Sequence, residues 1–157
     1  MTSLVAVTRV LDLPVDEAWK LVVDPRNHAR WVPLTRIAVN GLPLAVGTQV
    51  TAMSGPFTHR GFPGLPDRMR IDVLRPPEPG RTGEAVFTKT GPVLLGRAGI
   101  YAAPTDDGRS AVTWTEEVYL AGPLPQALTS ALLAPVLSLM LRWALRQVDR
   151  EVRRRIA

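Results

Sequence analysis

One long apolar segment, from about Leu124 to Ala157, restricts the fold of this chain more than any other feature. No charged residue occurs between Gln126 and Leu141, and apolar side chains lie on every side of this half when it is read as a helix. From Arg142 onward, apolar residues recur every three or four positions with arginines between them. A helix that is apolar all round must be covered all round or face a hollow, so we expect the rest of the chain to enclose this segment.

The length of 157 residues fits a single domain covering residues 1–157. The absence of cysteine excludes disulfides and thiolate zinc sites and fits a reducing compartment, so we expect a cytoplasmic protein. Gly122, Pro123 and Pro125 interrupt the front of the uncharged run, which favours a buried helix over a membrane span. The net charge of +5 comes almost wholly from arginine, and we interpret the run at 153–155 as a solvated helix end rather than a nucleic-acid contact.

The sequence upstream of the helix predicts strands separated by turns. A first strand at 4–13 is followed by two short helices, which begin near Pro14 and Pro25. Six further strands are predicted at 35–39, 48–54, 68–74, 83–90, 96–103 and 110–120. Short turns require antiparallel neighbours. We therefore predict an α+β fold in which a curved antiparallel sheet of about seven strands wraps around the C-terminal helix, with the two short helices after the first strand.

Several features of the segment from Thr8 to Leu34 occur together in one known family. They are a strand ending before Pro14, Trp19 in the first helix, Asp24-Pro25 closing it, and Trp31 followed by Pro33. With the strand-rich body and a terminal helix carrying Pro135, the chain resembles the polyketide cyclase/dehydrase and lipid-transport family of the START-like (SRPBCC) superfamily. The resemblance implies a helix-grip fold with an internal apolar cavity. It implies no catalytic residue, because no catalytic signature runs through the superfamily, whose members bind hydrophobic molecules, transfer lipids, or cyclise and dehydrate polyketides.

The final predicted strand carries the sharpest candidate for chemistry. Trp114 and Glu116 alternate along it and therefore share a face. If that face points inward, burial raises the pKa of the Glu116 carboxyl unless a cation lies near, and Arg9 and Arg97 are the candidate cations. Three roles stay open: an ion pair that closes the pocket rim, orientation of a ligand's polar group, or proton donation to a polyketide carbonyl. For the last role Tyr101 is the other candidate donor.

Apolar residues of the helix and the sheet are expected to contact a ligand, because small residues such as Ala52 and Ala98 leave space on a curved sheet. The predicted ligand-binding residues are Trp31, Met53, Phe87, Arg97, Tyr101, Trp114, Glu116, Val136, Leu139, Met140 and Trp143. Phe57, His59 and Phe62 lie in a loop rich in glycine and proline, which we interpret as a lid over the cavity mouth or as an ordinary packed loop. The other histidine, His28, is expected at the surface.

The sequence therefore predicts a protein that binds a hydrophobic small molecule, lipid-like or polyketide-like, between the sheet and the C-terminal helix. Two histidines and no cysteine give no basis for a metal site, and no cofactor is expected. Two other functions stay open. One is an enzyme, a polyketide cyclase or dehydratase; the other is dimerisation or membrane-surface contact through the apolar helix.

Overall fold

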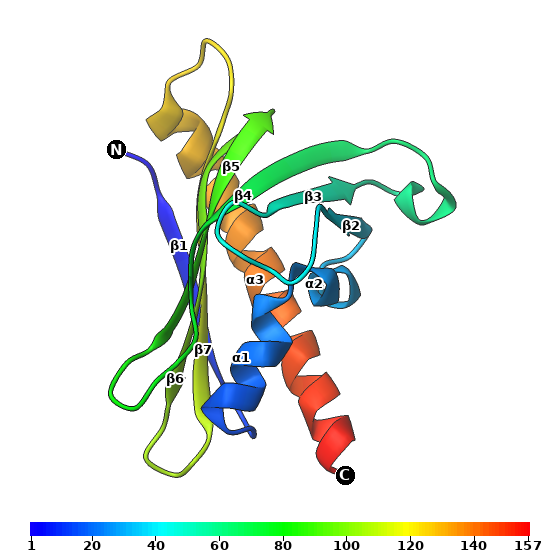
Figure 1. Cartoon of the computed structure of the whole chain (residues 1–157). Helices are drawn as coiled ribbons and strands as arrows, with labels where there is room; N and C mark the ends of the chain where they lie inside the picture. Colours follow the sequence, from blue (N-terminus) through cyan, green and yellow to red (C-terminus); the bar gives the residue numbers. More distant parts are fainter.

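The computed structural model describes residues 1–157, and its main feature is a curved sheet with one long helix packed along it (Figure 1). The strands are β1 (Leu4–Leu11), β2 (Thr35–Val39), β3 (Gln49–Ser54), β4 (Leu65–Arg75), β5 (Gly83–Pro92), β6 (Leu94–Pro104) and β7 (Ser110–Leu120). The helices are α1 (Val15–Val23), α2 (Pro25–Trp31) and α3 (Gln126–Ile156), and a short 3-10 turn, η1 (Thr58–Arg60), follows β3.

The sheet has the spatial order β1-β7-β6-β5-β4-β3-β2, and every neighbouring pair is antiparallel. Register shifts interrupt the pairing of β4 with β5 between Arg68 and Met69 and again between Ile71 and Val73. Bulges of this kind bend a strand and increase its twist. Strands β2 to β4 accordingly turn across the direction of β6 and β7 (Figure 1). The predicted α+β architecture, a curved antiparallel sheet around a terminal helix, is confirmed.

The C-terminal half of α3 forms the main contact between helix and sheet. Leu141, Leu145, Val148 and Val152 follow three- and four-residue spacing, and all are fully buried. Each such side chain contributes about 1.5–3 kcal/mol of hydrophobic stabilisation. Pro135 lies inside the helix, which begins nine residues earlier at Gln126, so this proline does not mark the start of α3.

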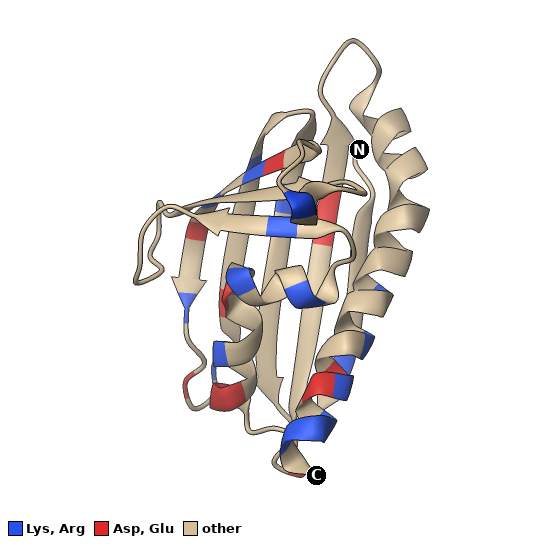
Figure 2. Cartoon of the chain, turned by 90° about the vertical axis from the view of Figure 1, so that its right-hand side faces the viewer, with Lys and Arg blue, Asp and Glu red and all other residues tan.

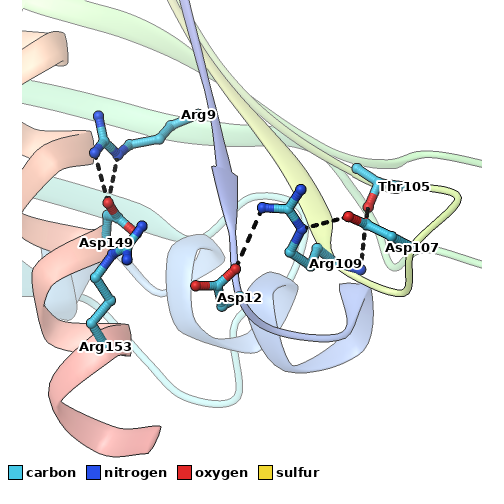
Figure 3. Close-up of polar contacts among 7 residues, drawn as sticks. All are labelled: Arg9, Asp12, Thr105, Asp107, Arg109, Asp149 and Arg153. Atoms are coloured by element: carbon cyan, nitrogen blue, oxygen red, sulfur yellow. Dashed lines mark hydrogen bonds and ion pairs between the residues drawn. The ribbon is translucent and has the colours of Figure 1, made fainter. Parts of the chain in front are cut away.

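Charged groups fix the same half of α3 to β1. Asp149 is buried, and its Oδ2 accepts hydrogen bonds from Nη2 of Arg9 at 2.6 Å and from Nε at 3.0 Å (Figure 3). Nε of Arg153, one helical turn further on, donates to the other oxygen at 3.2 Å. A buried carboxylate needs such partners to offset its lost hydration. Arg9 is therefore bound to the helix. It lies toward the end of β1, whereas Val5, the residue that pairs with Glu116, lies near the start of the same strand.

The N-terminal half of α3 has an uncovered face, contrary to the prediction that it is enclosed on all sides. Leu132, Val136 and Leu139 are 68%, 65% and 71% exposed, and Trp143 is 51% exposed. The reason is geometric, because the sheet lies on one side of the helix only and no other element covers the opposite side (Figure 2). By length and composition α3 would suffice to cross a membrane, and 28% of its apolar window is buried in the fold.

Candidate functional site

A cavity of about 90 Å³ lies between the concave face of the sheet, α2 and α3. This volume accommodates several water molecules. Its apolar wall combines Phe87, Ile100 and Trp114 from the sheet with Val32 at the end of α2 and Met140 from α3. The space exists because two inward sheet positions are alanines, namely Ala52 on β3 and Ala98 on β6.

Three charged side chains meet in the sheet wall of this cavity. Nζ of Lys89 on β5 lies 2.5 Å from Oδ2 of Asp67 on β4 and 3.5 Å from Oε2 of Glu116 on β7. The Lys89 and Glu116 side chains are only 4% and 6% exposed. The cluster therefore places one ammonium and two carboxylates in an otherwise apolar pocket.

The sheet register explains how residues on β5 and β7 reach one another across β6. Glu116 pairs with Ala98, and Lys89 pairs with Gly96, so the intervening strand carries small residues at both positions. Two strand spacings amount to roughly 10 Å, which a lysine and a glutamate side chain together bridge. A larger residue at position 98 would stand between the two charges.

The pKa values in the cluster move in a defined direction. Burial raises the pKa of the Glu116 carboxyl; the Lys89 ammonium opposes the shift, and the Asp67 carboxylate adds to it. Burial disfavours charge on Lys89, but the two carboxylates outweigh it and raise the pKa of the ammonium. Lys89 is thus held as a cation, and Glu116 is the member of the cluster suited to exchange a proton.

His28 is buried in the cavity wall, so the prediction of a surface position was wrong. Its ring centroid lies 4.6 Å from that of Trp114 and 5.7 Å from that of Trp31, and Nε2 lies 2.8 Å from the carbonyl oxygen of Val22. Burial lowers the pKa of His28 to about 4, so the ring is neutral near pH 7. Pro25, His28 and Trp31 recur every three residues on one face of α2, a spacing that indicates burial of all three.

The cavity wall includes four of the eleven predicted ligand-binding residues: Phe87, Trp114, Glu116 and Met140. Trp31 is buried behind His28, where its indole N–H donates to Oε2 of Glu151 at 2.7 Å. It therefore supports the wall without lining it. Val136, Leu139 and Trp143 lie on the exposed side of α3, on the opposite face of the helix from the sheet.

Arg97, Tyr101 and Met53 lie on the outer face of the sheet, and their predicted place in the cavity was wrong. Residues paired across antiparallel strands share a face, and Glu116 pairs with Ala98, so the inward positions of β6 are the even-numbered ones. A Cβ added at Gly99 would lie 2.7 Å from the Tyr101 ring, which thus covers the glycine on the outer face. Met53 alternates with inward residues of β3 in the same way.

The other predicted positions lie outside the cavity wall. Arg9 binds Asp149 and is not the cation beside Glu116. Phe57 and Phe62 are 57% and 59% exposed and contact each other edge to face, with ring centroids 6.3 Å apart. The loop that carries them and His59 contributes no residue to the cavity lining, and its predicted lid role stays a prediction.

Sequence reasoning missed Lys89 and Asp67, although both had a signal. Lys89 is one of two lysines in an arginine-rich chain, and strand alternation places it on the same face as Phe87. Asp67 alternates with Met69 and Ile71 in the same way, but the strand predicted at 68–74 leaves it in the preceding loop, because β4 begins earlier than its apolar pattern indicates.

Fold and site together define a helix-grip protein with a charged cluster inside an apolar cavity. The sequence matches the family model for polyketide cyclase/dehydrase and lipid transport over residues 3–153. This chain therefore belongs to that family, as its N-terminal segment predicted.

Solved structures share the fold at low sequence identity. The Zhui aromatase/cyclase from Streptomyces sp. R1128 is 17% identical, with a TM-score of 0.72 over 100% of this chain and 97% of that one. A Thermobifida fusca protein is 20% identical, with a TM-score of 0.68 over 96% and 93% of the two chains. The two-domain aromatase/cyclase BexL is 18% identical, with a TM-score of 0.64 over 96% of this chain and 46% of that one. No curated protein matches the sequence.

The buried His28 predicts a specific acid sensitivity. Its pKa is lowered from 6.5 to about 4 in the folded protein, so between these values the unfolded chain binds a proton that the native protein does not. Stability therefore falls as pH decreases from about 6.5 to about 4, by roughly 3 kcal/mol from this group. Replacing His28→Gln keeps an N–H donor for Val22 and is expected to flatten this part of the profile in urea unfolding.

The matched control is His59→Gln, which changes an exposed histidine in the loop and should leave the profile as in wild type. The pH dependence is read as the difference between each variant and wild type, because the Glu116 carboxyl, with its raised pKa, contributes with the opposite sign. An unchanged slope in His28→Gln would contradict the assignment of a neutral, buried imidazole.

Proposed function

We propose that this protein binds an apolar small molecule with a polar end in the cavity between the sheet, α2 and α3. The observation that carries this proposal is the juxtaposition of an apolar wall with a buried charged cluster in one cavity. Ligand pockets are mostly apolar and use a few polar groups to fix orientation. Membership in a family of polyketide cyclases and lipid-transport proteins supports the same function.

The energetics of such a site depend on a few side chains. Phe87, Ile100 and Trp114 offer aromatic and aliphatic surface on the sheet side, and Met140 closes the cavity from the helix side. Burial of apolar area is worth about 25 cal/mol per Å², so each ~100 Å² of apolar surface that a ligand covers supplies about 2.5 kcal/mol before the cost of association. Met140 has a flexible, unbranched side chain, which suits a wall that adapts to a guest.

Filling the cavity should abolish binding. Ala98→Leu places a larger side chain among the lining residues, and we expect the affinity for the neutral fluorophore phenylnaphthylamine to fall at least about tenfold, equivalent to about 1.4 kcal/mol. Fluorescence titration measures the affinity, and thermal unfolding checks that the variant folds. The control Ala103→Leu makes the same change on the outer face of β6 and should bind as wild type does. Equal binding by both variants would contradict the proposed site.

A second candidate function is acid–base catalysis on the bound molecule, as in a polyketide cyclase or dehydratase. A specific observation favours it, because burial raises the pKa of Glu116 in a pocket that also holds a cation. A carboxyl in this state is suited to give a proton to a carbonyl or to remove one from the carbon beside it. Tyr101, on the outer face, is not a donor for this cavity.

Catalysis, unlike binding alone, requires that the Glu116 carboxyl transfer a proton. Glu116→Gln keeps the shape of the side chain but cannot transfer a proton, so turnover of a poly-β-ketone substrate should fall at least about a hundredfold. Affinity for phenylnaphthylamine should remain within about tenfold of wild type. The measurement is product formation by mass spectrometry beside fluorescence titration. Unchanged turnover in Glu116→Gln would remove Glu116 as the acid or base.

A separate function is suggested by the uncovered face of α3, for which we propose contact with an anionic lipid surface. The exposed residues of its N-terminal part are apolar, namely Leu132, Val136 and Leu139, and Trp143 follows them. Beyond Trp143 the exposed residues include Arg146 and further arginines, which colour the C-terminal half of the helix blue in Figure 2. Helices that lie in a membrane interface combine an apolar face with cations that bind anionic headgroups. A second copy of the chain would offer the arginines no matching acidic stretch, because no acidic residue lies between Glu117 and Asp149.

The lipid contact is tested by removing apolar surface from exposed positions. We expect the triple variant Leu132→Ser, Val136→Ser, Leu139→Ser to lose co-sedimentation with phosphatidylglycerol vesicles, while wild type binds them and releases them at high salt. The side chains are exposed, so the variant should keep its thermal stability. A wild-type protein that ignores these vesicles, or one that forms a dimer which the same variant dissociates, would rule out this proposal.

A further inference from the structure

We propose that the cavity selects ligands whose polar end donates hydrogen bonds, such as phenols and alcohols, and discriminates against carboxylic acids. This inference rests on the proposed function, since it concerns which molecules the cavity binds. It comes from the hydrogen bonds that the charged cluster leaves unmade.

The cluster presents buried acceptors that have no donor. Oδ1 of Asp67 and Oε2 of Glu116 are both buried without a hydrogen-bond partner. Lys89 lies within ion-pair distance of that Glu116 oxygen, at 3.5 Å, but its short contact is with Asp67 at 2.5 Å. An unmatched buried oxygen costs roughly 1–3 kcal/mol relative to a bonded one. A ligand hydroxyl in the cavity would remove this cost.

The donors in the cavity wall are directed at acceptors of the wall itself. The Lys89 ammonium donates to Asp67 and lies beside Glu116, and the Trp114 indole N–H is directed at the Glu116 carboxyl. Nε2 of His28 lies 2.8 Å from a carbonyl oxygen, where it must carry the proton and donate. The hydroxyls of Thr35 and Ser54 bond each other at 2.9 Å, and Thr35 also donates to the Pro33 carbonyl. The wall is therefore rich in free acceptors and poor in free donors.

The charges of the cluster also disfavour a carboxylate ligand. One ammonium faces two carboxylates, so the cluster has no spare positive charge for an acid. Arg97 is on the outer face, and Arg9 is bound to Asp149, so neither arginine supplies a cation here. A carboxylate ligand would bring a third acidic group into a site of low polarity, where like charges are strongly unfavourable.

Three naphthalenes that differ only in their polar group test the inference. Naphthol offers a hydroxyl donor, methoxynaphthalene keeps the oxygen without the proton, and naphthoic acid adds a carboxylate. Measured at pH 7 by displacement of phenylnaphthylamine from the full-length protein, naphthol should bind at least about tenfold more tightly than either of the other two.

Removing one of the two acceptors should weaken the preference. In Glu116→Leu the free acceptor of Asp67 remains, and we expect the advantage of naphthol over methoxynaphthalene to shrink at least about threefold relative to wild type. The control Glu117→Leu makes the same change on the outer face and should keep the wild-type preference. A second variant, Glu116→Gln, removes the charge but keeps the size. It should bind naphthoic acid at least about fivefold more tightly than wild type does.

The possible results separate this inference from the function on which it rests. If none of the naphthalenes binds and phenylnaphthylamine does not bind either, the proposed function fails, and the inference fails with it. If methoxynaphthalene or naphthoic acid binds wild type as tightly as naphthol, the inference is overturned while cavity binding stands. A naphthol preference that is undiminished in Glu116→Leu likewise overturns the assignment to this cluster.

Discussion

The contact between the C-terminal half of α3 and the concave sheet is the interaction on which the rest of the structure depends. Leu141, Leu145 and Val148 are buried there, and the Arg9–Asp149 pair fixes the helix to β1. Because α3 is one continuous helix, fixing its C-terminal half also places its N-terminal half along the upper part of the sheet. There β2 to β4 turn away, and small sheet residues fail to fill the gap. The cavity is thus a consequence of a straight helix meeting a sheet that bends.

The charged cluster inside this cavity is difficult to explain by stability alone. Desolvating an ammonium and two carboxylates costs several kcal/mol per ion, and apolar residues of similar volume often serve a fold equally well. Lys89, Asp67 and Glu116 also leave two carboxylate oxygens without donors, which is a further cost. The ligand proposed for this cavity would supply donors to these oxygens and so offset part of that cost.

The fold was predictable because its signals are local: turn sequences, strand alternation and one long apolar run. The site depends on a different kind of information. Alternation along β6 groups Arg97 with Tyr101, but only the pairing of Glu116 with Ala98 decides that this group faces outward. Lys89 contacts Glu116 across an intervening strand, and no pattern within either strand predicts that these two residues lie close together. Alternation along a strand sorts its residues into two faces. Only the pairing register with the neighbouring strands shows which face points inward and which residues lie beside each other.

Two adjacent residues of α3 join the cavity to the exposed surface of the molecule. Met140 lines the cavity, whereas Leu139 is 71% exposed on the other side of the same helical turn. In this part of the helix only Thr129 and Ser130 are fully buried, and Ala134, Leu137 and Met140 pack on the core from partly exposed positions. Segments with few buried contacts open at low free energy. The N-terminal half of α3 therefore opens at lower free energy than its C-terminal half, and the proposed lipid contact would bind the outer side of the same helical turn whose inner side lines the cavity.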